Sequence, residues 1–278
     1  LLAGPPIDAV LVCGPPDLHR SAGVAALRAG KPVFMEKPPA ENLAGALEVR
    51  EAARASGVIC MVGFMKRFAL RYREAKEIAA GPDFGALTHV FFKYSHWDMP
   101  TPHDMLMYMT VHPLDLMRFF LGEIERVTID RVERGGQSAY TLVFRARGGA
   151  IGNLLTGAHQ PRLKERLEVV GEGAFVAVNN LVELEYHRRV EARRHFTNDL
   201  GDIDLVRPDF AIPNLNQNTL FLQGYADELK EFASAVLEKR APSVTIEDGV
   251  EAMRLMELME RTALHASYVR SGEEWVEG

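Results

Sequence analysis

The first 65 residues alternate short apolar runs with segments of helical periodicity, and this alternation limits the possible folds more than any other feature of the sequence. The apolar runs cover residues 7–13, 32–35 and 58–62, and the helical segments 19–30 and 42–56 lie between them. Strands separated by single helices run parallel, because a parallel pair needs a long crossover connection whereas an antiparallel pair needs only a tight turn. The pattern therefore predicts part of a doubly wound parallel sheet.

The rest of the chain has a different texture, with short apolar runs separated by glycines or charged residues. Antiparallel strands are predicted at residues 87–97, 124–132, 139–144 and 150–156. Helices are predicted at residues 110–121, 224–237 and 247–266, and a long loop at 188–218. This part reads as an α+β domain with a large, mainly antiparallel sheet, so we divide the chain into domains 1–65 and 66–278.

The composition favours a soluble protein with a small-molecule partner. A formal net charge of -6 gives no electrostatic reason to bind nucleic acid or an anionic membrane. No apolar stretch reaches the roughly 20 residues that span a bilayer. Cys13 and Cys60 lie inside apolar runs, which favours packed, reduced thiols over a disulfide. We therefore expect a cytoplasmic protein without nucleic-acid or membrane partners.

Three predicted strand ends carry polar or conformationally restricted residues. Pro15 and Pro16 follow the first strand, Glu36-Lys37-Pro38 follows the second, and residues 64–67 follow the third. Ligands of doubly wound sheets bind beyond the carboxyl ends of the strands. These segments are therefore candidate ligand contacts.

Six segments resemble, in the same order, motifs of the glucose-fructose oxidoreductase/inositol dehydrogenase (Gfo/Idh/MocA) family. They are residues 8–19, 27–38, 63–68, 112–116, 224–225 and 247–249. The resemblance covers almost the whole chain, and the ordered series is much more specific than a lone Glu-Lys-Pro. It implies a Rossmann-like sheet at residues 1–65, as the C-terminal part of a dinucleotide-binding domain. Residues 66–278 would then bind the substrate and mediate oligomerisation.

The resemblance also implies the activity and the partners. We expect an NAD- or NADP-dependent oxidoreductase that transfers a hydride between the nicotinamide and a secondary alcohol or ketone of a polyol, sugar or sugar derivative. The predicted strands of the second domain outnumber the helices that could cover them. Self-association through this sheet is therefore expected, as a homodimer or homotetramer.

Four residues are candidates for the chemistry. Oxidation of a secondary alcohol needs a proton acceptor and a positive charge near the oxygen. Lys37 would supply the charge, and His112 would take the proton, because an unperturbed imidazole titrates near neutrality. Helical spacing places Tyr108 one turn before His112 and Asp115 nearly one turn after it. Asp115 either holds the imidazole tautomer or anchors the helix, and Tyr108 either hydrogen-bonds the substrate or narrows the pocket.

Cofactor contacts are assigned through the resemblance. Glu36 resembles the residue that contacts the cofactor ribose, with a structural partnership to the neighbouring Lys37 as the alternative. Pro15, Pro16 and His19 resemble the turn beside the cofactor, and they also end a strand and start a helix. Arg67 either faces the nicotinamide or substrate, or is an exposed helix start.

Substrate contacts are expected from Lys37, Trp97, Tyr108 and His112. The nearby His96 and His103 are separated by a spacing, without a neighbouring cysteine, that is a poor metal signature. No metal ion is expected.

Two features depart from the family pattern. Its members normally begin with a further βαβ stretch whose Gly-rich turn receives the pyrophosphate, and roughly 60 such residues would be expected before Leu1. Tyr108 also stands where the family often has an aspartate. Two hypotheses follow: an enzyme whose first βαβ unit lies outside this sequence, or a non-catalytic sugar-binding or assembly relative that has lost its dinucleotide cradle.

Overall fold

The computed structural model describes residues 7–189, 203–207 and 215–278. The chain forms two compact units, each discontinuous along the sequence. Unit 1 holds Leu1–Met65, Leu106–Asp115 and Tyr225–Arg261, and unit 2 holds Lys66–Met105, Leu116–Gly224 and Thr262–Gly278. The chain thus crosses between units after residue 65, and the division into two continuous domains stays a prediction.

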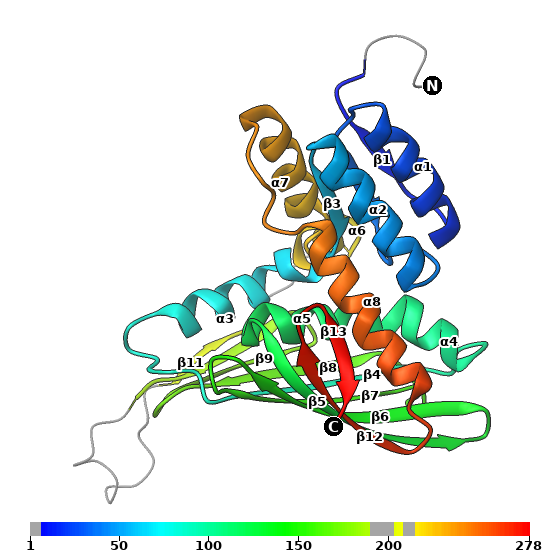
Figure 1. Ribbon diagram of the computed structural model, residues 1–278. Coiled ribbons are helices and arrows are strands. Elements are labelled where there is room, and N and C mark those ends of the chain that lie inside the picture. The colour runs from blue at the N-terminus through cyan, green and yellow to red at the C-terminus, as the bar shows by residue number, and fades with distance from the viewer. Residues whose placement is uncertain (1–6, 190–202, 208–214) are drawn as a thin grey trace, which may run out of the picture. The chain divides into compact units, whose positions relative to one another are not determined.

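Unit 1 is built on a parallel sheet of strands β1 (Val10–Val12), β2 (Val33–Glu36) and β3 (Cys60–Gly63), in that order (Figure 1). Helices α1 (Pro16–Arg28) and α2 (Leu43–Ser56) form the crossovers. Helices α7 (Tyr225–Glu238) and α8 (Ile246–Arg261) come from the end of the chain. The predicted partial doubly wound sheet is confirmed.

Helices cover both faces of this sheet. Met35 faces α1, where a Cβ added at Gly23 would come within 2.6 Å of the Met35 Cε. Phe34 packs instead against Phe232 of α7, with ring centroids 5.8 Å apart. Successive strand residues point to opposite faces, so an unbroken apolar run is what a strand buried on both sides requires.

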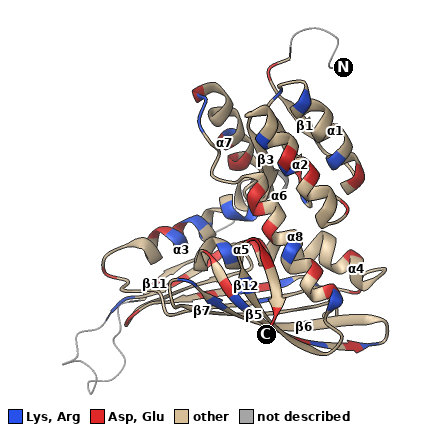
Figure 2. Cartoon of the chain, in the orientation of Figure 1, with Lys and Arg blue, Asp and Glu red and all other residues tan. Residues whose placement is uncertain are grey.

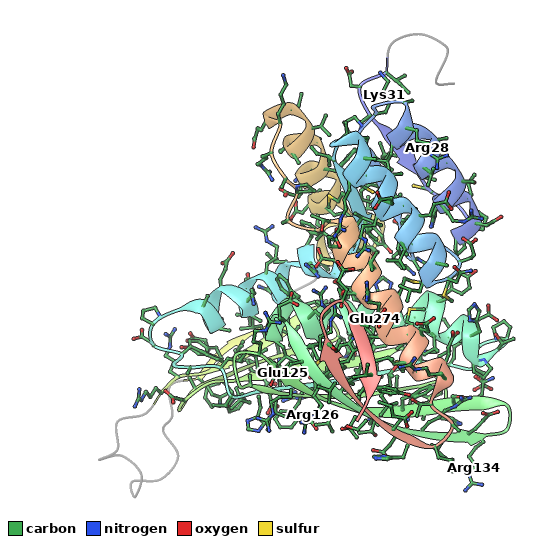
Figure 3. All side chains as sticks on the ribbon, in the orientation of Figure 1. Arg28, Lys31, Glu125, Arg126, Arg134 and Glu274 are labelled. Carbon is green, nitrogen blue, oxygen red and sulfur yellow. The ribbon has the colours of Figure 1, made fainter. Side chains whose placement is uncertain are left out.

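Side chains stabilise the ends of both crossover helices. The Asn42 side chain caps α2 by accepting a hydrogen bond from the Gly45 amide at 2.8 Å. Arg28 and Lys31, labelled in Figure 3, lie at the C-terminal end of α1, where positive charge complements the helix dipole. Because α1 runs antiparallel to the strands, its N-terminus at Pro16 lies at the opposite edge, where the strands end.

The described part of unit 2 contains a ten-stranded sheet in the order β11-β10-β9-β8-β4-β7-β6-β5-β12-β13 (Figure 1). The strands are β4 (His89–Ser95), β5 (Ile124–Arg134), β6 (Gln137–Ala146), β7 (Ile151–Gly157), β8 (Lys164–Val170), β9 (Phe175–Asn179), β10 (Glu183–His187), β11 (Ile203–Val206), β12 (His265–Ser271) and β13 (Glu274–Glu277). Strands β4 and β7 pair in parallel, and the other neighbours are antiparallel. The predicted large, mainly antiparallel sheet is confirmed.

Helix α3 (Leu70–Ala80) and the later part of α5 (Val111–Leu121) pack on one face of this sheet. Tyr72 of α3 is fully buried, with ring centroids 6.3 Å from Phe92 of β4 and 6.5 Å from Phe120 of α5. A Cβ added at Gly152 of β7 would come within 2.5 Å of the Met117 side chain. Gly152 therefore lets α5 approach the sheet closely.

Several elements differ from the prediction. The helix expected from residue 110 is preceded by α4 (Pro102–Asp104) and by a π-helical segment, η2 (Met105–Thr110). The helix expected to reach residue 266 ends at Arg261, because the following residues form β12 and pair with β5. Helix α3 and the short 3-10 helix η1 (Met65–Phe68) were not predicted.

The predicted loop at residues 188–218 contains regular structure. Residues 203–206 form β11, which pairs with β10, and α6 (Leu215–Leu222) begins inside the predicted loop. The pairing partner of β11 gives it a strand conformation that its isolated sequence does not reveal. Residues 190–202 and 208–214 of the predicted loop lie outside the described residues.

The surface and the thiols complete the description. Acidic and basic side chains are interspersed on α2, α3 and α8 (Figure 2), and Arg54 of α2 pairs with Glu247 of α8 at 2.9 Å. Both cysteines are free; Cys60 is buried as expected, but Cys13 is exposed because β1 ends one residue before it. Among the helices described, none has the length and apolar character needed to cross a membrane.

Candidate active site

One buried histidine joins the turn after β1 to the loop after β2. His19 is 1% exposed, and its Nδ1 donates a hydrogen bond to the Pro38 carbonyl oxygen at 2.8 Å. Its Nε2 accepts a hydrogen bond from the Gly14 amide at 3.2 Å, a network that assigns the proton to Nδ1. Both ring nitrogens are thus used within unit 1. His19 therefore links the two loops of the predicted cofactor edge, and its predicted cofactor contact stays a prediction.

The two prolines after β1 have different environments. Pro16 is the first residue of α1 and is buried, whereas Pro15 is the N-cap residue and is exposed. Proline suits the first turn of a helix, because the amide that it lacks would have no partner within the helix. Of the two predicted contacts, Pro15 is therefore the one that a ligand at this edge can touch.

Lys37 forms a hydrogen bond to a helical segment of the same unit that is far away in the sequence. It follows β2 directly and is half-buried, and the Lys37–Pro38 peptide bond is cis. Its Nζ donates a hydrogen bond to the main-chain carbonyl oxygen of Tyr108 at 2.9 Å. This bond brings the ammonium group from the end of β2 to the segment that also carries His112.

That segment changes from π-helix to α-helix between Thr110 and Val111. π-Helical turns are rare and occur frequently at functional sites. Tyr108, within the π-helix, is 42% exposed, whereas His112 and Asp115 on α5 are 5% and 1% exposed. The hydroxyphenyl group of Tyr108 therefore meets solvent, while the imidazole and the carboxyl group lie inside unit 1.

Glu36 lies at the carboxyl edge of β2, next to the end of β3. It is half-buried, and its Oε2 accepts a hydrogen bond from the Lys37 amide at 3.2 Å. The paired residue of β3 is Gly63, where an added Cβ would lie 3.0 Å from the Phe34 ring and 3.4 Å from the Glu36 carboxyl carbon. Gly63 thus keeps the space beside the Glu36 carboxyl group free of a side chain.

The motif at the end of β3 continues into unit 2. Lys66 is 3% exposed and forms an ion pair of 2.6 Å with Glu165 of β8, which is 5% exposed. The Arg67 guanidinium lies over the ring of Phe119, 5.5 Å from its centroid. Lys66 therefore anchors the start of unit 2 to its sheet, and the predicted ligand contact of Arg67 remains a proposal.

The candidate substrate residue Trp97 is also in unit 2. It is 48% exposed and follows His96, which is fully buried and bonds the Trp97 carbonyl oxygen through Nδ1 at 2.8 Å. Burial lowers the pKa of His96, so this ring is a neutral part of the core. In the described part of the chain, no three His, Cys, Asp or Glu side chains are grouped to hold a metal ion.

Two residues at the start of α7 were not predicted from the sequence. Burial first, and the charge of Glu36 second, raise the pKa values of Tyr225 and Glu228. The resemblance includes Gly224-Tyr225, but Glu228 looks like an ordinary charged residue on a helix. A charge on the same face as the buried Phe232 and Ala235 was the available signal.

The two sheets define a Rossmann-type fold with a large, mainly antiparallel sheet appended to it. A family described as "Oxidoreductase family, NAD-binding Rossmann fold" matches residues 1–64, and the GFO/IDH/MocA C-terminal domain matches residues 72–177. The chain belongs to the Gfo/Idh/MocA family.

Two inositol dehydrogenases are identical to this chain at about a quarter of the aligned positions. Myo-inositol 2-dehydrogenase of Thermotoga maritima is 28% identical, over 92% of this chain and 77% of that protein. Scyllo-inositol 2-dehydrogenase (NAD(+)) of Bacillus subtilis is 27% identical, over 88% of this chain and 72% of that protein.

Solved structures share the fold. A dehydrogenase from Chromobacterium violaceum has a TM-score of 0.82 and 25% identity, and the match covers 91% of this chain and 75% of that one. A levoglucosan dehydrogenase in complex with NADH and L-sorbose has a TM-score of 0.79 at 19% identity, covering 99% of this chain and 81% of that one. At that identity the second likeness concerns the fold alone.

Proposed function

We propose that the protein is an NAD(P)-dependent oxidoreductase that transfers a hydride between the nicotinamide and a secondary alcohol or ketone of a polyol or sugar. The observation that carries this proposal is the hydrogen bond between the Lys37 ammonium and the Tyr108 carbonyl oxygen. It joins a strand end at the ligand edge of the parallel sheet to the segment that carries His112. The names of the relatives, which act on inositols, support a polyol substrate.

The residues of unit 1 divide the chemistry between charge and proton transfer. Lys37 stabilises negative charge on the substrate oxygen, because its ammonium group carries a positive charge and lies at the ligand edge of the parallel sheet. His112 takes the hydroxyl proton during oxidation and returns it during reduction. Asp115, buried one turn further along α5, fixes the orientation of the histidine. The bound dinucleotide would supply the hydride acceptor or donor.

The residues at the strand ends fit a dinucleotide. The half-buried carboxylate of Glu36 can accept hydrogen bonds from ribose hydroxyl groups, and Gly63 leaves room beside it. Pro15 is exposed at the N-terminus of α1, on the same sheet edge. Arg67 and Trp97 belong to unit 2, and their contacts with the cofactor and the substrate stay predictions.

Cofactor binding and turnover test the proposal directly. We expect NADH or NADPH to be bound with a micromolar dissociation constant in a fluorescence titration of the full-length protein, including any residues that precede Leu1. Myo-inositol, or a related polyol, should reduce the oxidised cofactor, as followed by absorbance. Binding of a polyol without any binding of NADH or NADPH would instead support the non-catalytic sugar-binding relative.

We also propose that two copies associate through the open face of the unit 2 sheet, in the cytoplasm. Phe91, Val143 and Leu155 are 43%, 39% and 45% exposed on neighbouring strands β4, β6 and β7. Register pairing places them on one face, where Phe91 and Leu155 line a depression of about 250 Å³. Exposed apolar side chains grouped on one face are typical of an interface.

Leu155→Asp should disrupt this association. A carboxylate buried in an apolar interface is costly, so self-association should weaken at least about tenfold in sedimentation velocity experiments. Leu237→Asp, which changes a leucine of α7 that is 82% exposed, is the matched control and should leave the oligomeric state unchanged. A wild-type protein that sediments as a monomer at micromolar concentration would refute the proposed interface.

A further inference from the structure

The start of α7 carries a carboxyl group in an environment that opposes its ionisation. Glu228 is 1% exposed, and its Oε2 is buried without a hydrogen-bond partner among the described residues. A buried carboxylate normally requires a cation or several donors. Neither is found for Glu228 in the part of the chain that the structure describes.

The charged neighbour of Glu228 is another carboxyl group. Phe232, one turn after Glu228 on α7, packs against Phe34 of β2 with ring centroids 5.8 Å apart, and Glu36 lies two residues after Phe34 on the same face of that strand. Burial first, and the charge of Glu36 second, raise the pKa of Glu228 to about 9. The pKa values of Cys13 and Tyr225 are also raised, by desolvation and then by the charges of Glu36 and Glu228. Four acidic groups, those of Glu36, Glu228, Cys13 and Tyr225, therefore interact electrostatically. Each is neutral when protonated and negative when it has lost its proton. They come from the ends of β1 and β2 and from the start of α7.

The members of this group differ in their access to a ligand. Glu36 and Tyr225 are half-buried and Cys13 is exposed, whereas Glu228 is 1% exposed. A ligand at the strand edge can therefore touch Glu36 but not the carboxyl group of Glu228. Glu228 therefore affects the binding of such a ligand indirectly, because its ionisation changes the charge next to Glu36.

We propose that Glu228 is a positioning residue: it keeps its proton at neutral pH, leaves Glu36 as the charged acceptor for the ribose hydroxyls, and weakens dinucleotide binding when it ionises. This inference rests on the proposed function, in which Glu36 contacts the cofactor. A single carboxylate accepts hydrogen bonds from a diol. A second negative charge next to it repels the first, and the pair then changes its geometry or takes up a proton.

The sign of the pH dependence follows from the raised pKa. Below pH 9 Glu228 is mainly neutral and binding is strong. Above pH 9 the binding-competent, protonated fraction falls to about a tenth at pH 10, so the dissociation constant for NADH should rise by up to about tenfold between pH 7 and pH 10.

Glu228→Gln separates this effect from the other titrations. Glutamine resembles the protonated carboxyl group, so E228Q should bind NADH within about twofold of wild type at pH 7. The dissociation constant of E228Q for NADH should change less than about threefold up to pH 10. Cys13, Tyr225 and Lys37 account for this smaller remaining change. The readout is a fluorescence titration of the full-length protein with NADH at each pH.

Glu231→Gln is the matched control on the same helix. Bonds from Arg240 lower the pKa of Glu231, so that it is ionised throughout this pH range. E231Q should therefore show the wild-type pH dependence. If E228Q keeps the wild-type pH dependence, or binds NADH more than about tenfold weaker at pH 7, the role assigned to Glu228 is overturned.

A cofactor-free measurement distinguishes failure of the inference from failure of the proposed function. In protein labelled with ¹³C at the glutamate carboxyl groups, the signal absent from E228Q should titrate near pH 9 in wild type, and at lower pH in E36Q. A midpoint near the ordinary glutamate value, or one unchanged in E36Q, refutes the coupling of the two carboxyl groups. If no variant binds NADH or NADPH while the midpoints behave as expected, the proposed function fails and the carboxyl pair stands without its cofactor role.

Discussion

Lys37→Met should lower kcat/KM for polyol oxidation by roughly several hundredfold while leaving the protein folded. Methionine keeps much of the apolar side-chain volume but removes the positive charge that we place next to the substrate oxygen. Loss of a donor to a developing oxyanion costs roughly 3 to 4 kcal/mol in comparable sites, which corresponds to this change in rate. Steady-state kinetics with circular dichroism as a folding check would measure it.

Lys76→Met is a matched control for this prediction. Lys76 is also half-buried, and its Nζ also donates to a main-chain carbonyl oxygen, that of Phe119, at 2.7 Å. Loss of this bond should cost stability only, and kcat/KM should stay within about twofold of wild type. A Lys37→Met enzyme with more than a tenth of wild-type kcat/KM would contradict the electrostatic role of Lys37.

The parallel sheet could be predicted because its signals are local. The runs of β2 and β3 are apolar and buried on both faces, and the run of β1 is apolar although Leu11 on this edge strand is 54% exposed. Asn42 marks the start of α2 by a side-chain hydrogen bond to a residue three positions away. The family motifs lie at the ends of these strands. We therefore expected Lys37 to lie close to the segment that carries Tyr108 and His112. The hydrogen bond from Lys37 to the main-chain carbonyl oxygen of Tyr108 was not predicted.

Elements that depend on distant partners were missed. Helix α3 buries only Tyr72 and Ala75, so its sequence shows little amphipathic periodicity. Strand β12 follows a long helix and is fixed by pairing with β5, far away in the sequence. The buried state of Glu228 likewise depends on α7 packing over β2. In each case the information lies in a contact between separate segments.

The π-helix explains why the helix that carries His112 was predicted to begin only at residue 110. Met105, Leu106 and Met107 are consecutive and all buried, a pattern that a regular amphipathic helix does not produce. Sequence periodicity therefore begins at α5. The residues before it include Tyr108, whose carbonyl oxygen binds Lys37.

His112→Ala should reduce kcat by about a hundredfold or more, whereas Tyr108→Phe should change it less than about tenfold. A positioned proton acceptor contributes roughly 10² to 10⁴ to the rate, and the imidazole is the group that can take the hydroxyl proton. The bond that Tyr108 makes to Lys37 uses its main-chain carbonyl oxygen, which phenylalanine also provides. Its partly exposed phenol therefore contributes less.

The pH profile distinguishes the chemical role of His112 from a structural one. An imidazole that accepts a proton must be neutral, so oxidation by wild type should fall as the pH is lowered through the titration of this base. That acidic limb should disappear from kcat/KM in the residual activity of His112→Ala and persist in Tyr108→Phe. If His112→Ala keeps wild-type turnover and Tyr108→Phe abolishes it, the proton passes through the phenol, and Tyr108 rather than His112 is the proton acceptor.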